Sequence, residues 1–234
     1  MNLKIMLKKF QKVYKRMNKK GIILLSGGLD SLVSLDIARK KCDVVLALLF
    51  NYGHKAFEDE LKASKEICEY YNIKQKVIEL PFLKELSDNA LTNKDKNNLD
   101  TLDGVWIPNR NGLFLNIAAA YCDKLDIDYI IFGANRQEGV DFPDNTKEFV
   151  NSTEEFFKYS TIKNPKVVAP CLEFDKIQII NYAIDNNVPL NLLKSCYEGS
   201  KTTSKKHCGK CMSCKLLYNA ILNSKKPELI KEIF

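Results

Sequence analysis

Short apolar runs alternate with longer amphipathic stretches along most of the chain. The runs, which predict strands, lie at 21–25, 44–50, 75–80, 129–132 and 167–169. The stretches, which predict helices, lie at 30–41, 57–71 and 112–125. Strands that are apolar throughout and alternate with helices form a parallel sheet covered on both faces, so the pattern predicts a doubly wound, Rossmann-like α/β fold. In such sheets, ligands bind beyond the carboxyl ends of the strands.

A different pattern precedes the first predicted strand. Apolar residues recur there at helical spacing, at Leu3, Leu7, Phe10, Tyr14 and Met17. Eight of the chain's 36 Lys and Arg residues lie within 1–20, which has no Asp or Glu, so the net charge of +7 arises there and the remainder is close to neutral. We predict a basic amphipathic helix over 1–20 that docks on the body or on a second subunit; membrane or tRNA contact are the alternatives.

Length and composition limit the class of protein. A chain of 234 residues, 45% hydrophobic and 28% charged, fits one α/β domain with a small appendage and excludes a repeat array or a disordered chain. No window approaches the roughly 18 apolar residues of a membrane span, and the start lacks the features of a secretory signal. We therefore expect a cytoplasmic enzyme with a small-molecule substrate, no membrane, no stable nucleic-acid complex, and a homodimer as the default assembly.

Two connections are long and polar, at 81–110 and 133–144. Loops of this length in a compact domain are usually functional, so both are expected to serve ligand binding. The charged tail at 224–231 predicts a solvated terminal helix. The expected division is a helix over 1–20, a nucleotide-binding α/β domain over 21–190 and a metal-binding segment over 191–234.

The segment Leu25-Ser26-Gly27-Gly28-Leu29-Asp30-Ser31 lies between the first predicted strand and the first predicted helix. Paired glycines let backbone N–H groups approach an anion, and the following helix directs its positive dipole end to the same place. The segment lacks the lysine of a Walker A loop and the third spaced glycine of a dinucleotide fingerprint. It predicts an anion-binding site; a tight turn capped by Asp30 or Ser31 is the alternative.

The same segment resembles the PP-loop of the ATP pyrophosphatases, which cleave ATP between the α and β phosphates. The resemblance implies that ATP binds at Leu25 to Ser31, with Asp30 and Ser31 in catalytic roles. Mg²⁺ is then expected between Asp30 and the phosphates, because a carboxylate beside pyrophosphate needs an intervening cation. Arg110, Arg136 or Lys163 could supply the positive charge that the absent lysine leaves.

The eight cysteines fall into two groups. Cys42, Cys68, Cys122 and Cys171 are scattered through apolar segments and are predicted to be core thiols. Cys196, Cys208, Cys211 and Cys214 fall within nineteen residues and predict a Zn²⁺ site of four thiolates, with an iron–sulfur cluster or a redox pair as alternatives. A full tetrahedron leaves no open position, so the metal is expected to be structural, and His207 is expected beside the site or exposed.

The two features together resemble the 7-cyano-7-deazaguanine synthase family, from about residue 21 to residue 218. The motifs that carry the resemblance are Ser-Gly-Gly-Leu-Asp-Ser at 26–31, Phe-Asn-Tyr-Gly at 50–53, Val-Trp-Ile-Pro-Asn-Arg-Asn at 105–111, Ser-Cys-Tyr-Glu at 195–198 and His-Cys-Gly-Lys-Cys-x-x-Cys at 207–214. The commonest family pattern has Gln-Arg-His after Tyr-Gly and, later, Asp-Tyr-Ser-Gly-Tyr-Pro-Asp-Cys. This chain instead has His54-Lys55-Ala56 and Val140-Asp141-Phe142-Pro143-Asp144-Asn145.

The resemblance implies an ATP-dependent C–N ligase that converts 7-carboxy-7-deazaguanine and ammonia into 7-cyano-7-deazaguanine (preQ0), in queuosine or archaeosine biosynthesis. Transfer of AMP activates the carboxylate, ammonia gives an amide, and a second adenylation permits dehydration to the nitrile. No protein nucleophile is needed, and no Ser/His/Asp arrangement is recognisable. The candidates for contacts with the substrate are Arg110, Asn111, Asn135, Asp141, Asp144 and Lys163, with Tyr52 or Phe142 stacking on its ring.

Two other functions remain open at this point. One is a PP-loop adenylating enzyme that acts on tRNA, of the thiolase or lysidine type, which the basic N-terminal segment would favour. The other is a zinc-ribbon binding module without catalysis, which consumption of ATP would exclude.

Overall fold

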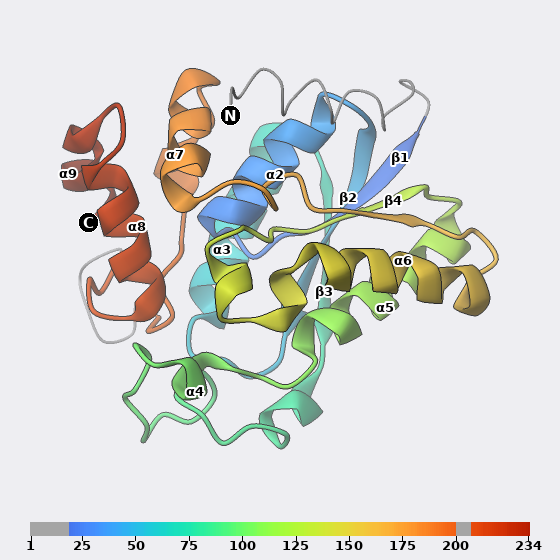
Figure 1. Cartoon of the computed structure of the whole chain (residues 1–234), viewed down its shortest axis with the longest axis horizontal. Coiled ribbons are helices and arrows are strands. Elements are labelled where there is room, and N and C mark those ends of the chain that lie inside the picture. The colour runs from blue at the N-terminus through green and yellow to red at the C-terminus, as the bar shows by residue number, and fades with distance from the viewer. Residues whose placement is uncertain (1–18, 200–206) are drawn as a thin grey trace.

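The computed structural model describes residues 19–199 and 207–234, and its centre is a five-stranded sheet (Figure 1). The strands, in chain order, are β1 (Lys20–Leu24), β2 (Asp43–Asn51), β3 (Lys74–Glu79), β4 (Tyr129–Ile131) and β5 (Lys166–Val168). Their spatial order is β3-β2-β1-β4-β5, and every neighbouring pair is parallel. The predicted parallel α/β sheet is therefore confirmed.

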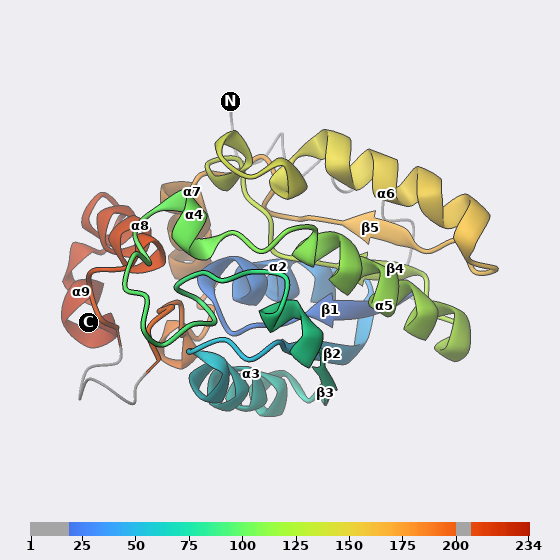
Figure 2. The same cartoon turned by 90° about the horizontal axis from the view of Figure 1, so that it is seen from below.

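Helices cover both faces of the sheet (Figures 1 and 2). They are α2 (Leu29–Arg39), α3 (Phe57–Tyr71), α4 (Leu102–Val105), α5 (Arg110–Leu125), α6 (Lys147–Ser160), α7 (Lys176–Asp185), α8 (Met212–Leu222) and α9 (Ile230–Ile233). Successive strand residues point to opposite faces, so Ile23 packs with α2, α3 and α7 while Ile22 packs with α5 and α6. The core is thus two apolar layers that the sheet separates.

The order in which strands are added to the sheet changes direction between the neighbouring strands β1 and β4. From β1 the chain builds β2 and β3 on one side and then crosses to β4 and β5 on the other. Such a switch point opens a crevice at the carboxyl ends of the two central strands. The glycine loop follows β1 and Gly133 follows β4, so both border this crevice. A Cβ at Gly133 would lie 2.7 Å from the Ser31 nitrogen, which shows how closely the two connections meet.

The prediction of a solvated terminal helix at 224–231 is partly wrong. The helix there is α9, which begins only at Ile230, and Ile233 is 2% exposed. The ring of the terminal Phe234 contacts His207, with centroids 5.1 Å apart. The end of the chain is therefore packed against the body, because its last apolar residues close the core around α8.

The predicted N-terminal helix over 1–20, on which the expected homodimer partly rests, lies almost wholly outside the described residues. The two long loops contain short helical turns: η1 (Pro81–Lys84) and α4 in the first, and η2 (Glu138–Val140) and η3 (Pro143–Asn145) in or beside the second. Among residues 19–199 and 207–234, no helix is long and apolar enough to cross a bilayer.

Candidate active site

The glycine loop presents its backbone to the crevice. Gly27 has a φ of +85°, and a Cβ there would lie 2.9 Å from the Ala63 Cβ, so both the conformation and the space require glycine. Gly28 is the N-cap of α2, and because glycine has no side chain, neither Asp30 nor Ser31 serves as the cap of that helix. The alternative of a turn capped by Asp30 or Ser31 is thus not what the structure shows. The first-turn N–H groups and the helix dipole instead suit an anion.

A second segment, residues 193–197 from the C-terminal part of the chain, packs against this loop. The Lys194 N–H donates to the Gly27 carbonyl at 2.9 Å, and the Leu29 N–H donates to Ser195 Oγ at 3.1 Å. Ser195 in turn donates its own N–H to His207 Nε2 at 3.1 Å. One wall of the crevice is therefore built from the region of the cysteine cluster.

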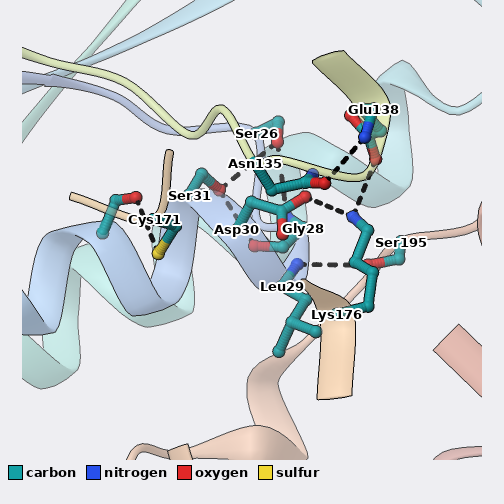
Figure 3. A network of polar contacts seen from close by, with 11 residues as sticks. Ser26, Gly28, Leu29, Asp30, Ser31, Asn135, Glu138, Cys171, Lys176 and Ser195 are labelled. Carbon is teal, nitrogen blue, oxygen red and sulfur yellow. Dashed lines mark hydrogen bonds and ion pairs between the residues drawn. The ribbon is translucent and has the colours of Figure 1, made fainter. Parts of the chain in front are cut away.

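A buried cluster of opposite charges lies beside the loop (Figure 3). The ammonium of Lys176, 7% exposed at the start of α7, pairs with the Asp30 carboxylate and lies 2.8 Å from Glu138 Oε1. Burial acts to lower the pKa of Lys176, but the two carboxylates outweigh it, so the pKa is raised. Burial raises the pKa of Asp30, whereas Lys176 overcomes burial at Glu138 and lowers that pKa. Two carboxylates face one ammonium, which leaves an excess of negative charge.

Asn135 completes this cluster. It is fully buried, and its Oδ1 accepts the Glu138 N–H at 2.9 Å (Figure 3). Its amide faces both carboxylates and lowers the pKa of each, although burial is the larger influence on both. Asp30 Oδ1 is buried and makes no hydrogen bond of ordinary geometry to any described residue. An unpaired carboxylate oxygen next to an anion-binding loop is the ligand that a hard cation such as Mg²⁺ prefers.

The crevice contains a cavity of about 200 Å³, and aromatic side chains form one of its walls. Tyr52 stacks on His54, with ring centroids 4.0 Å apart, and Phe114 stacks on Phe50 at the same distance. Arg110 Nη1 donates to the Tyr52 hydroxyl at 3.2 Å and lies beside the rings. Burial raises the pKa of Tyr52 to about 12, so this hydroxyl stays protonated. A planar ring with a charged or polar edge fits such a wall.

Most of the predicted substrate contacts gather here. Arg110 and Asn111 line the cavity, and Asn135 lies under the charge cluster. Asp144 is buried, and burial raises its pKa while the nearby Arg110 opposes that rise. Asp141, however, is exposed and does not line the cavity. The loop turns at η3 so that Asp144 points inward while Asp141 faces solvent.

Lys163 is not in the site. Its ammonium lies 2.5 Å from Asp126 and 3.7 Å from Asp128, just before β4 begins. That position is at the amino ends of the strands, on the opposite edge of the sheet from the glycine loop. Arg136 pairs with Asp175 at 2.9 Å and is largely exposed. Of the three cationic residues expected from the sequence, only Arg110 lines the cavity. Lys176 and Lys194 also line it, and neither was expected from the sequence.

The cysteine cluster is assembled as predicted. The Sγ atoms of Cys196, Cys208, Cys211 and Cys214 all lie within 4.8 Å of one another, a spacing that could hold a metal ion. The N–H of Cys208 points to Cys196 Sγ and that of Cys211 to Cys208 Sγ, each at 3.4 Å, and such contacts stabilise thiolates. The other four cysteines are buried free thiols, as expected.

His207 is buried rather than exposed, and it is not part of the thiol group. Its Nε2 accepts the Ser195 N–H, so the proton on the neutral ring belongs on Nδ1, which lies 2.8 Å from the Ile233 carbonyl. The imidazole therefore ties the cavity wall to the end of the chain.

Comparison with known proteins gives consistent results. The family model described as queuosine biosynthesis protein QueC matches residues 20–224. A 7-cyano-7-deazaguanine synthase from Carboxydothermus hydrogenoformans is 42% identical, over 86% of this chain and 98% of that protein. Another from Methanosarcina mazei is 36% identical, over 83% and 90% respectively.

Two solved structures share the fold. The U34-tRNA thiolase NcsA from Methanococcus maripaludis has a TM-score of 0.52 and 19% identity, covering 80% of this chain and 64% of that one. A predicted subunit of a tRNA methyltransferase from Methanocaldococcus jannaschii has a TM-score of 0.51 and 22% identity, covering 71% and 76%. At these identities the likeness concerns the fold alone.

Proposed function

The chain belongs to the queuosine biosynthesis protein QueC family, and from that premise we propose that it is a 7-cyano-7-deazaguanine synthase. It converts 7-carboxy-7-deazaguanine and ammonia into the nitrile preQ0 at the expense of ATP, and it is an ATP-dependent C–N ligase. The observation that carries this proposal is that one cavity joins an anion-binding loop to an aromatic wall edged by Arg110. That combination suits a nucleotide phosphate next to a planar heterocyclic acid.

ATP is assigned to the glycine loop. The backbone N–H groups in the first turn of α2 would receive its phosphates at the edge of the cavity. The excess negative charge of Asp30 and Glu138 fits Mg²⁺, which those two carboxylates would hold. When bound, Mg²⁺ supplies charge neutralisation of the phosphates.

The residues of the cavity position the reactants. A carboxylate is a poor electrophile, so transfer of AMP is needed before ammonia can form the amide, and the amide oxygen must be adenylated in turn before it leaves. The Arg110 guanidinium, held by Tyr52 and near Asp144, would pair with the substrate carboxylate or with the guanine-like edge. Ring stacking on the aromatic wall excludes water from the activated intermediates. Catalysis is then mostly orientation and charge neutralisation.

Zn²⁺ is assigned to the four cysteines. Four thiolates satisfy a tetrahedral ion completely, so the metal would have no position for substrate. Its role would be to fix the segment that carries Lys194, Ser195 and Tyr197, all of which line the cavity. Loss of the metal would thus weaken substrate binding by disordering this wall of the cavity, and the metal itself would not contact the substrate.

The proposal is tested by ATP–pyrophosphate exchange with purified protein. Exchange should require 7-carboxy-7-deazaguanine and should not be supported by unmodified tRNA. Exchange that responds to tRNA and not to the acid would favour a tRNA-adenylating enzyme instead. Release of ADP and phosphate in place of AMP and pyrophosphate would contradict the assignment of the loop.

A further inference from the structure

A hydroxyl from the C-terminal part of the chain reaches the start of α2. Ser195 lines the cavity, and its Oγ accepts the Leu29 N–H at 3.1 Å (Figure 3). The same oxygen lies over Gly28, since a Cβ built there would be 3.6 Å from it. Leu29 is the first residue of α2, so this N–H belongs to the positive end of the helix dipole. Ser195 therefore occupies a backbone donor that a phosphate would otherwise receive.

The position of Ser195 is fixed by the segments on both sides of it. Its own N–H donates to His207 Nε2 at 3.1 Å, and the N–H of the preceding residue donates to the Gly27 carbonyl at 2.9 Å. The next residue along is Cys196, whose Sγ receives the N–H of Cys208 at 3.4 Å. The hydroxyl is thus held at the loop by the same wall that carries the cysteine cluster.

The Ser195 hydroxyl can bond in two directions. Its oxygen accepts the Leu29 N–H, and its proton has no acceptor within the part of the chain that the structure describes. A hydroxyl that accepts one hydrogen bond is polarised and becomes a stronger donor in the next. Ser195 thus replaces a backbone N–H by an O–H that can turn towards the cavity.

The other two hydroxyls at the loop are committed within it. Ser31 Oγ donates to the Gly28 carbonyl at 3.0 Å. Ser26 Oγ accepts the Gly28 N–H at 3.3 Å and lies 3.4 Å from Ser31 Oγ, which can receive its proton (Figure 3). Of these three serines, Ser195 is therefore the one whose proton is left for a ligand.

We propose that Ser195 binds a phosphate of the nucleotide, its O–H donating to a non-bridging oxygen while its Oγ keeps the Leu29 N–H. The inference rests on the proposed function, which assigns ATP to the glycine loop. The hydroxyl extends the positive end of α2 to the phosphate, and it acts as a hydrogen-bond donor that forms no covalent bond. Ser195 belongs to the Ser-Cys-Tyr-Glu motif, so one short motif supplies both a thiol of the cysteine cluster and a ligand of the nucleotide.

The test measures binding of α,β-methylene-ATP with Mg²⁺ by isothermal titration calorimetry, because this nucleotide cannot be cleaved between its α and β phosphates. Ser195→Ala should bind it about 10–100-fold more weakly than the wild type, since a hydrogen bond to a charged oxygen is lost. Ser195→Thr and Ser195→Val introduce the same shape, and only the first keeps the hydroxyl. The Ser195→Thr variant should therefore bind at least about tenfold more tightly than the Ser195→Val variant.

Two controls separate phosphate binding from a change of shape. Affinity for adenosine, which has no phosphate, should be unchanged in Ser195→Ala, as should zinc content and the KM for the acid. Thr161→Ala is the matched control, because Thr161 Oγ1 also accepts a backbone N–H, that of Asn164 at 3.0 Å, and does not line the cavity. It should bind the nucleotide as the wild type does.

Two results would overturn the inference. One is equal affinity of the Ser195→Thr and Ser195→Val variants for the nucleotide. The other is a parallel loss of nucleotide and adenosine affinity in Ser195→Ala, which would mean that Ser195 only shapes the cavity. If the nucleotide affinities change as expected but the wild-type protein makes no nitrile from the acid, the proposed function fails while this inference stands.

Discussion

Removing the buried ammonium of Lys176 should destabilise the protein strongly. Lys176→Met keeps most of the side-chain volume but leaves the carboxylates of Asp30 and Glu138 facing each other without a cation. Breaking a buried ion pair by removing one partner costs about 3–5 kcal/mol. A native domain is stable by about 5–15 kcal/mol, so the loss is a large fraction of the total. In a chain of this length, we expect the thermal midpoint to fall by about 6–20 °C.

The pH dependence of this loss follows from the pKa shifts. In the wild type, Lys176 holds the pKa of Glu138 below its ordinary value of 4.5. The stabilisation that this ion pair gives to the folded state is therefore fully present above pH 4.5 and is lost as the pH falls through the folded-state pKa of Glu138. In the variant the ammonium no longer opposes burial, so the pKa values of both carboxyls rise, and protonation on acidification relieves their repulsion. The stability gap between the two proteins should therefore be widest near neutral pH and should narrow towards about pH 5.

The assay is urea unfolding of both proteins across this pH range, with Lys163→Met as the matched control. Lys163 is also paired with carboxylates, but it lies near the surface at the far edge of the sheet. Its substitution should leave both the midpoint and carboxylate-dependent ATP turnover close to those of the wild type. Equal stability of Lys176→Met and the wild type near neutral pH, or a gap that widens on acidification, would refute the reasoning.

Three further predictions concern the loop, the metal and the cavity wall. Asp30→Asn should lower acid-dependent AMP release by about 100-fold or more while preserving the circular dichroism spectrum, because it removes a ligand of the Mg²⁺ that neutralises the phosphates. Near-normal AMP release would contradict that role. Metal analysis should find one zinc per chain, and Cys208→Ser should lose it together with soluble yield, whereas iron with sulfide would contradict the assignment. His207→Ala should cost about 1–3 kcal/mol in urea unfolding, because the Ser195 N–H then loses its buried acceptor, and an unchanged midpoint would show that water replaces the ring.

The sheet could be predicted from the sequence because its signals are local. The helix expected over 57–71 is α3, and the strand runs differ from those observed by one residue or so at each end. The helix α7 was missed although Asp175 and Gln178 form a capping box, a local signal that the sequence does contain. The helix α8, also missed, begins at Met212 with Cys211 as its N-cap, so its first turn coincides with the cysteine motif.

The chemistry of the site could be predicted from spacing where its residues are neighbours in the chain, and residues further apart, such as Arg110 and Asn135, could be predicted only as members of the two long loops. The glycine loop and three of the four clustered cysteines belong to short motifs, so their chemistry is readable from spacing. Lys176 lies 146 positions from Asp30, and their contact depends on α7 packing against α2. The choice of Lys163 was wrong for the same reason, since sequence spacing does not say which edge of a sheet a loop lysine reaches. Burial of His207 likewise depends on the chain end packing back over it.

The central claim is that this chain makes a nitrile from a carboxylate, and the most direct measurement is mass spectrometry of the product. Purified protein with ATP, Mg²⁺, ¹⁵N-ammonium and 7-carboxy-7-deazaguanine should give 7-cyano-7-deazaguanine that carries the heavy nitrogen. One AMP should appear for each carboxylate oxygen removed. Unchanged acid, or AMP formed without any labelled amide or nitrile, would contradict the account.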